Sequence, residues 1–302
     1  MIQVSNLVKT YNKGSVQAVN DISFHVQAGE LFGLIGPDGA GKSSIFRMLT
    51  TLLLPDSGQA LVGGDDIVKD YQAIRNRIGY MPGRFSLYQD LTVEENLEFF
   101  ATVFNTTIEK NYHLIQDIYV QIEPFKQRRA GKLSGGMKQK LALCCALIHK
   151  PEVLFLDEPT TGVDVVSRRE FWEMLKKLKQ QGLTIMVSTP YMDEAALCDR
   201  IAFLQQGRIL SIDTPARLIE HYPDSLYAVQ DEKMYPLLLA LRAYEGSRRC
   251  FAFGESLHLT LQTGVTEKDL RTYLQAKGFG QARIETTVPG IEDCFIQLLN
   301  PA

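Results

Sequence analysis

The sequence lacks the features that mark several classes of protein. It has only five cysteines in 302 residues and no CxxC pair, so we expect reduced thiols in a cytosolic protein rather than a disulfide framework or a zinc site. The formal net charge is −3, and composition therefore gives no basic surface for nucleic acid. No uncharged apolar run approaches the ~18 residues that span a bilayer, and no signal peptide is expected. The remaining composition, 45% hydrophobic and 22% charged, is typical of a globular protein in solution.

The order of predicted elements divides the chain in two. Residues 1–222 alternate short buried strands with helices, which predicts an α/β domain with a mostly parallel sheet. Composition changes near Pro223, and residues 223–302 then follow the order strand, helix, hairpin, helix, strand, helix. This order is typical of a small α+β domain with its own sheet, and we expect a ferredoxin-like appendage.

Three helices of the first part carry clear local signals. Thr92 is placed to cap a helix and Glu95 follows three residues later, which is a capping box and predicts a helix over 94–117. Apolar periodicity predicts further helices over 42–53 and 133–149. Both of these begin next to glycine-rich turns, where chemistry that involves phosphate is expected.

The clearest motif is Gly36-Pro37-Asp38-Gly39-Ala40-Gly41-Lys42-Ser43, which matches G-x-x-x-x-G-K-[ST] between a predicted strand and a helix. The glycines let backbone N–H groups curl around a β-phosphate, Lys42 can reach the β- and γ-phosphates, and the Ser43 hydroxyl can ligate Mg²⁺. The alternative is a glycine-rich turn that arose by chance, and the strand–loop–helix frame argues against it. The motif predicts a nucleoside triphosphate site.

A second part of that site follows an apolar strand over 153–156. The strand ends in Asp157 and Glu158. Asp157 is expected to hold Mg²⁺, and Glu158 to position and polarise the attacking water. Two solvated acids at a strand end are the alternative, which the upstream phosphate loop makes the weaker interpretation.

The stretch Leu133-Ser134-Gly135-Gly136-Met137-Lys138-Gln139 predicts another phosphate-binding surface. A Ser-Gly-Gly turn that opens a helix offers N–H groups and a hydroxyl at the positive helix end. One nucleotide does not need two such surfaces on one domain, so the simplest use of the second is a nucleotide held by another subunit. A plain helix cap with two flexible glycines is the alternative.

Together these residues resemble the ATPase subunits of ABC transporters over about residues 1–220. The resemblance implies a P-loop NTPase fold with an antiparallel β subdomain, a helical subdomain at about 84–150, and pairs of domains that stack head to tail around ATP. It also implies a role for Tyr11 as an adenine-stacking aromatic, where an ordinary strand aromatic is the alternative and stacking is worth ~1–3 kcal/mol. The roles carried over are Walker A for Gly36, Gly39, Gly41, Lys42, Ser43 and Ser44, signature loop for Leu133 to Gln139 including Ser134, Gly135 and Gly136, Walker B and catalytic carboxylate for Asp157 and Glu158, and D-loop for Thr161-Gly162-Val163-Asp164.

Two positions depart from the family pattern. Gly83 stands where the family's Q-loop has a glutamine that contacts Mg²⁺ and water, and Pro190 stands where its switch has a histidine that contacts the γ-phosphate. Glycine has no side chain, and proline lacks both a side-chain donor and a backbone N–H. Loss of one preorganised donor costs ~10²–10³-fold in rate, so we expect this chain's own site to bind MgATP and to turn over slowly. Asp38 replaces the usual asparagine and adds a negative charge near the phosphates.

Residues 85–97, the GPDGAGK loop and the segment 291–295 look like ATPases of ABC-2-type exporters, in particular the first half of tandem bacterial drug-export ATPases. The resemblance implies a subunit on the cytoplasmic face of the inner or plasma membrane, with an ABC-2-type permease and a second ATPase as partners. A groove near residues 83–100 would receive the permease, although Phe85, Leu87 and Tyr88 could equally be core residues. An ATPase that powers export and a nucleotide-gated regulatory subunit with negligible hydrolysis both remain open. Soluble ABC proteins of translation or repair carry two cassettes or a long coiled coil, which this chain lacks.

Overall fold

In the computed structural model, which describes residues 1–299, contacts divide the chain into two units, Met1–Pro215 and Ala216–Ala302. The sequence placed the boundary between 222 and 223. Helix α8 (Pro215–Glu220) starts where the structural units meet. The units are described separately below.

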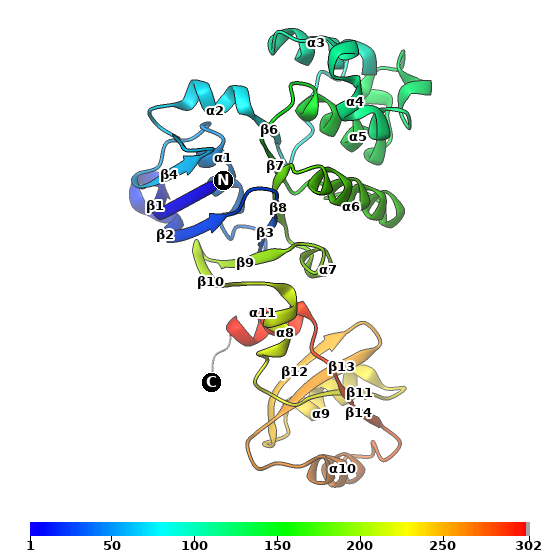
Figure 1. Cartoon of the computed structure of the whole chain (residues 1–302). Coiled ribbons are helices and arrows are strands. Elements are labelled where there is room, and N and C mark those ends of the chain that lie inside the picture. The colour runs from blue at the N-terminus through cyan, green and yellow to red at the C-terminus, as the bar shows by residue number, and fades with distance from the viewer. Residues whose placement is uncertain (300–302) are drawn as a thin grey trace. The chain divides into compact units, whose positions relative to one another are not determined.

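A six-stranded sheet forms the centre of the first unit, in the order β10-β9-β3-β8-β7-β6 (Figure 1). Every residue of β3, β7 and β8 is buried, as expected for a parallel sheet with helices on both faces. All neighbours are parallel except the final β9–β10 hairpin. The strands are β3 (Leu31–Ile35), β6 (Ile78–Met81), β7 (Val153–Asp157), β8 (Thr184–Thr189), β9 (Arg200–Gln205) and β10 (Arg208–Asp213).

An antiparallel sheet of order β2-β1-β4-β5 lies against this core. Its apolar side chains share one buried cluster with α1 and the central sheet. The sequence patterns did not reveal β4, β5 or α2. They also predicted that α1 reaches residue 53, but the helix ends at Leu49 because Thr51 adopts a left-handed φ of 62°. The elements are β1 (Ile2–Tyr11), β2 (Val16–Val26), β4 (Ser57–Val62), β5 (Asp65–Asp66), α1 (Lys42–Leu49) and α2 (Tyr71–Arg77).

The helical part of the first unit contains α3 (Val93–Val103), α4 (Ile108–Tyr119) and α5 (Gly135–Leu147) (Figure 1). The capping box of Thr92 and Glu95 is present as predicted. The predicted single helix over 94–117 is wrong, because Asn105 adopts a φ of 52° and Thr107 caps a separate helix. Helices α3 and α4 pack against α5, so they hold the helix that opens at the Ser-Gly-Gly turn.

The second unit has the order β11-α9-β12-β13-α10-β14-α11 and an antiparallel sheet of order β12-β13-β11-β14. This topology confirms the predicted ferredoxin-like appendage. A separate cluster of apolar side chains, centred on Val229, Leu241 and Leu270, forms its core. The elements are β11 (Leu226–Gln230), α9 (Met234–Arg242), β12 (Ser247–Phe253), β13 (Ser256–Leu261), α10 (Glu267–Ala276), β14 (Arg283–Thr287) and α11 (Ile291–Leu299).

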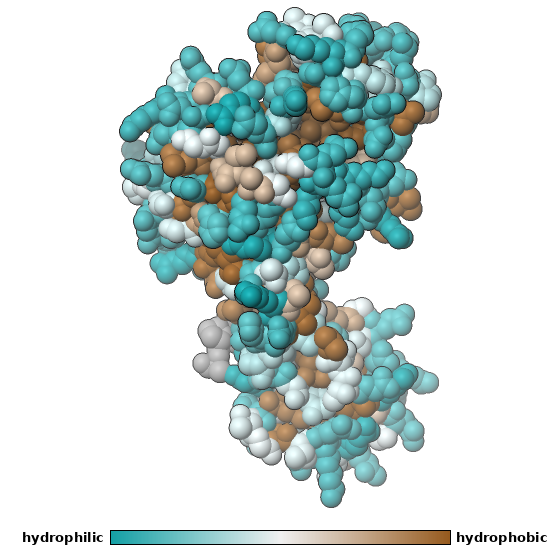
Figure 2. Space-filling view, in the orientation of Figure 1, coloured by the Kyte–Doolittle hydropathy of each residue, from teal (hydrophilic) through white to brown (hydrophobic). Residues whose placement is uncertain are grey.

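Within residues 1–299, none of the helices combines the length and the apolar character that crossing a membrane requires. Hydrophilic residues cover most of the face shown in Figure 2, and apolar residues occupy smaller patches. Two further helices of the first unit are α6 (Val165–Gln180), which directly follows residues 161–164, and the short α7 (Met192–Ala195), which begins two residues after Pro190.

Candidate functional site

The phosphate loop connects β3 to α1 through two glycines that have no room for a side chain. A Cβ at Gly36 would lie 2.2 Å from the carbonyl oxygen of Leu204, and one at Gly41 would lie 2.2 Å from that of Ala18. Gly41 also adopts a φ of 108°, a conformation that side chains disfavour. Glycine at these positions is therefore a steric requirement, and the loop curls as tightly as the motif predicts.

Lys42 is held inside this loop. Its side chain is 3% exposed, and Nζ donates to the carbonyl oxygens of Gly36 at 2.7 Å and Pro37 at 3.0 Å. The ammonium also pairs with Glu158 Oε1 at 3.1 Å. A buried ammonium requires such partners, and phosphate oxygens can replace them without moving the lysine far.

The two acids stand at the end of β7, beside β8. Ser188 Oγ donates to Asp157 Oδ1 at 2.6 Å, and the Glu158 N–H donates to Ser188 Oγ at 3.0 Å. Glu158 adopts a left-handed φ of 50°, which directs the chain away from the strand at some cost in backbone strain. The sequence analysis missed Ser188, although a serine inside an apolar buried strand and in register with Asp157 is a recognisable signal.

The site fits a nucleotide with a divalent cation. Ser43, Asp157 and Glu158 line one cleft. Within the described chain, no cluster of three or more His, Cys, Asp or Glu side chains could hold a metal by itself. Two oxygen groups, from Ser43 and Asp157, would leave the other positions to phosphate and water, which is the arrangement that Mg²⁺ favours. The Tyr11 hydroxyl lies 3.1 Å from Ser44 Oγ, so the predicted adenine-stacking ring is near the same loop.

The Ser-Gly-Gly turn is a separate surface. Ser134 caps α5 by accepting from the Met137 N–H at 3.3 Å, and Ser134 and Gly135 are exposed. Gly136 is buried against the start of α6, where a Cβ would lie 2.6 Å from Ser167 Oγ. Among the described residues that line the cleft at Asp157, neither Ser134 nor Gly135 is included. The exposed Ser134 and Gly135 therefore lie outside the cleft that Ser43, Asp157 and Glu158 line.

Gly83 lies beside the backbone of the two acids, whereas Pro190 is linked to them only through β8. A Cβ at Gly83 would lie 3.1 Å from the Asp157 carbonyl oxygen and 3.8 Å from Glu158 Cβ. Pro190 directly follows β8, whose Ser188 contacts both acids. Gly83 beside the acids, and Pro190 two residues after Ser188, thus lack a side-chain donor.

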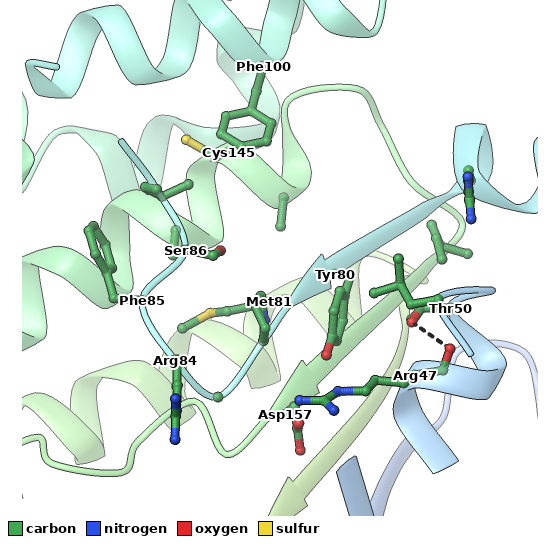
Figure 3. A pocket seen from close by; sticks show the side chains of 18 of the residues that line it. Arg47, Thr50, Tyr80, Met81, Arg84, Phe85, Ser86, Phe100, Cys145 and Asp157 are labelled. Carbon is green, nitrogen blue, oxygen red and sulfur yellow. Dashed lines mark hydrogen bonds between the residues drawn. The ribbon is translucent and has the colours of Figure 1, made fainter. Parts of the chain in front are cut away.

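The cleft extends from the acids to the helical part and has a volume of about 1150 Å³. Its lining includes Arg47, Tyr80, Arg84, Phe85 and Phe100 (Figure 3). Burial, together with the nearby charge of Asp157, raises the pKa of Tyr80 to about 12, so this phenol stays neutral. The far end of the cleft is more apolar than the end at the acids.

The predicted groove near residues 83–100 contains both buried core residues and exposed surface residues. Leu87 is 7% exposed and belongs to the core, whereas Tyr88 is 51% exposed. The ring of Phe85 lies 5.5 Å from Lys138 Nζ on α5. The segment after Gly83 therefore contacts α5, the helix that the Ser-Gly-Gly turn opens, within this groove.

The chain is similar to known proteins along its length. The family model described as ABC transporter matches residues 19–161. The chain is 39% identical to the probable multidrug ABC transporter ATP-binding protein YbhF of Escherichia coli (strain K12) over 100% of its own length, but it spans only 52% of that protein. It is 36% identical to the Nod factor export ATP-binding protein I of Rhizobium sp. (strain N33), over 98% of this chain and 96% of the relative.

Solved structures agree with the fold. The dimeric, post-hydrolysis ATP-binding cassette MJ0796 bound to ADP and Pi superposes with a TM-score of 0.65 and 25% identity, over 71% of this chain and 98% of the other. A structure of the ATP-binding subunit of an ABC transporter gives a TM-score of 0.66 and 26% identity, over 74% of this chain and 93% of the other. The P-loop NTPase fold that the family resemblance implied is confirmed.

Proposed function

Because the chain belongs to the ABC transporter family of ATP-binding proteins, we propose that it is an ATPase subunit that powers the export of a small molecule or drug. We propose further that it is the degenerate half of an asymmetric ATPase pair. The observation that supports this second step is the contrast at the acids: Lys42, Asp157 and Glu158 are assembled, while Gly83 and Pro190 beside them offer no donor.

In this proposal each residue has a defined task at the chain's own site. Lys42 binds the β- and γ-phosphates, Tyr11 stacks on the adenine, and Ser43 and Asp157 hold Mg²⁺. When bound, Mg²⁺ supplies neutralisation of the charge that develops on the phosphate oxygens. Ser188 keeps Asp157 in place, and Glu158 orients the attacking water and accepts its proton.

The rate at this site is expected to be low. A preorganised donor aimed at developing charge is worth ~10²–10³-fold in rate, and two such donors are missing. Binding depends on Lys42 and the loop, which are complete, and should be retained. The exposed Ser134 and Gly135 would then serve a nucleotide on the second ATPase, where their N–H groups and hydroxyl meet phosphate at a helix N-terminus.

The membrane partner is proposed to be an ABC-2-type permease that docks at the groove near residues 83–100, which places the chain on the cytoplasmic face of the membrane. The partly exposed ring of Phe99, which contacts Tyr88 at a centroid distance of 4.8 Å, supports a surface for an apolar helix. The exported substrates named for two relatives, multiple drugs and Nod factor, support a small organic cargo.

The test compares Ser134→Arg with Glu158→Gln in the assembled transporter. Ser134→Arg blocks the Ser-Gly-Gly turn that is proposed to bind the nucleotide of the second ATPase, and it should abolish most ATP turnover. Glu158→Gln affects only the chain's own slow site and should leave most turnover intact. If Glu158→Gln abolishes turnover and Ser134→Arg barely changes it, the asymmetric proposal is wrong.

A second candidate is a nucleotide-gated regulatory subunit with negligible hydrolysis, which the donor-free positions 83 and 190 also favour. Turnover of the purified chain, alone and with its partner ATPase, separates the two candidates. The ATPase proposal requires slow but measurable turnover at the chain's own site, which disappears in Glu158→Gln when the partner ATPase lacks its own catalytic carboxylate. The regulatory candidate requires nucleotide-dependent assembly in which Glu158→Gln changes nothing.

A further inference from the structure

A buried carboxylate outside the phosphate site joins three segments of the first unit. Glu194 on α7 is 2% exposed. Its Oε1 accepts from Thr160 Oγ1 at 2.7 Å and from Arg168 Nε at 3.1 Å, and its Oε2 accepts from Thr189 Oγ1 at 2.5 Å. A buried carboxylate is costly unless charged and hydrogen-bonding partners surround it, and here both oxygens are engaged.

The three donors lie beside segments that the sequence analysis assigned to the ATP site. Thr160 directly precedes the D-loop at 161–164, and Thr189 directly precedes Pro190. Arg168 lies on α6, the helix that follows the D-loop, and its guanidinium stacks on the Tyr191 ring at 4.2 Å. One carboxylate thus holds the D-loop, the segment around Pro190 and α6 together.

The D-loop is fixed at both of its ends. At its end, Asp164 caps α6 by accepting from the Ser167 N–H at 3.0 Å. At its beginning, Thr160 is tied to Glu194. Between them Gly162 adopts a φ of 74°. A loop with two fixed ends and few residues between them presents one conformation to whatever faces it.

The same carboxylate orders the segment around Pro190. The Thr189 hydroxyl donates to Glu194 and accepts from the Tyr191 N–H at 3.1 Å, so the residues on both sides of Pro190 are held. Pro190 has no donor with which bound nucleotide could order this segment. The order must therefore come from inside the protein, and Glu194 provides it.

We infer that Glu194 is a positioning residue that sets the D-loop against the segment around Pro190, and so controls ATP turnover across the subunit pair without contacting the nucleotide. The inference rests on the proposed function and on the D-loop role that the family resemblance implies for residues 161–164, which in that family touch the opposite subunit. A misplacement of about 1 Å remote from the chemistry can lower a rate by ~10²-fold. Loss of Glu194 should therefore lower kcat and leave the KM for ATP unchanged.

The chain offers a matched control for this test. Asp193 is the neighbouring acid and pairs with the same Arg168, at 3.2 Å, but its side chain is 75% exposed. Asp193→Asn removes one negative charge beside Arg168 and leaves the buried contacts in place. Glu194→Gln removes the buried charge, and Thr160→Val removes only the hydroxyl that ties the D-loop to it.

The experiment measures amide hydrogen exchange of residues 160–164 in the full-length chain, and kcat and KM for ATP in the assembled transporter. We expect faster exchange in Glu194→Gln and Thr160→Val with kcat about tenfold lower, and wild-type behaviour in Asp193→Asn. The effect of Thr160→Val should vanish in a Glu194→Ala background, because that background has already lost the oxygen that accepts from the Thr160 hydroxyl.

Wild-type exchange in Thr160→Val, or a rise in KM at unchanged kcat in either variant, would overturn the inference. If Glu194→Gln does not fold, Thr160→Val alone decides. If Ser134→Arg does not lower the ATP turnover of the assembled transporter, the proposed function fails. The hydrogen-exchange rates still show whether Glu194 fixes the D-loop.

Discussion

The phosphate loop and the Ser-Gly-Gly turn are both glycine-rich turns that open a helix, yet they are packed in opposite ways. At the loop, Gly36 and Gly41 press against carbonyl oxygens and Lys42 is folded inward. At the turn, only Gly136 is packed, and Ser134 and Gly135 face outward. This difference supports the proposal that the two motifs serve different nucleotides, the inward one the chain's own ligand and the outward one a ligand that another subunit brings.

The largest expected effect comes from a substitution in the phosphate loop, the inward-packed motif of this comparison. Lys42→Ala removes contacts to two phosphates, and each charge-assisted hydrogen bond is worth ~1.5–3 kcal/mol. The affinity of the full chain for MgATP should fall by ~10²-fold or more. Lys138→Ala on α5 is the control and should leave this affinity unchanged. Calorimetric titration measures both, and equal losses in the two variants would contradict the assignment of the loop as the chain's own site.

The next effect concerns stability at the outward side. Gly136→Ala places a methyl group 2.6 Å from Ser167 Oγ, whereas a Cβ at Gly135 would approach nothing more closely than the Gly162 carbonyl oxygen at 3.5 Å. Overpacking costs ~1–3 kcal/mol, while both changes gain similarly in helix propensity. Urea unfolding should therefore show Gly136→Ala to be less stable than Gly135→Ala. Equal stabilities would mean that Gly136 is free to move.

A gain of function sharpens the comparison. Gly83→Gln with Pro190→His restores two side chains beside Asp157 and Glu158, and we expect the turnover of the chain's own site to rise about tenfold, part of the ~10²–10³ that one donor can supply. The measurement uses a partner ATPase whose own catalytic carboxylate is removed. The gain should disappear when Glu158→Gln is added, and an unchanged rate would show that another feature keeps this site slow.

The smallest expected effect concerns the contact that links the end of α5 to the central sheet. His149 follows α5, and its Nε2 lies 2.9 Å from the Ile78 carbonyl oxygen on β6, while Nδ1 has no partner among the described residues. Burial lowers the pKa of His149 below its usual 6.5, so the unfolded chain binds this proton more readily. The free energy of unfolding should consequently fall as pH drops below 6.5 toward the folded pKa. His149→Gln should flatten this dependence in unfolding curves measured across pH 5–7.

Local signals predicted much of the fold and of the site. The Walker residues, the cap at Thr92 and the ferredoxin-like order depend on short-range patterns that the sequence shows directly. Strand β4 was missed because its first residues are exposed and it contains Gly58, so it has neither a buried run nor a clean alternation. The break at Asn105 was missed because a single left-handed residue leaves no periodic signal.

The Glu194 contacts could not have been predicted from spacing. Thr160 and Glu194 are 34 residues apart, and Thr189 and Arg168 come from two further elements. No spacing between them predicts that they meet, and the packing of α7 against β8, together with the Arg168–Glu194 contact, brings them together. The strand that ends in two acids predicted the roles of Asp157 and Glu158, but not the serine that contacts both of them.

The left-handed backbone at Glu158 has a consequence for the stability of the chain. A side chain in this conformation costs ~1–2 kcal/mol, and only glycine or asparagine adopts it readily. The residue that would activate water is thus also one of the non-glycine residues with a strained, left-handed backbone. Replacing Glu158 with glycine should relieve this strain but also removes the carboxylate that pairs with the buried Lys42 ammonium, so the backbone strain and the ion pair belong to the same residue.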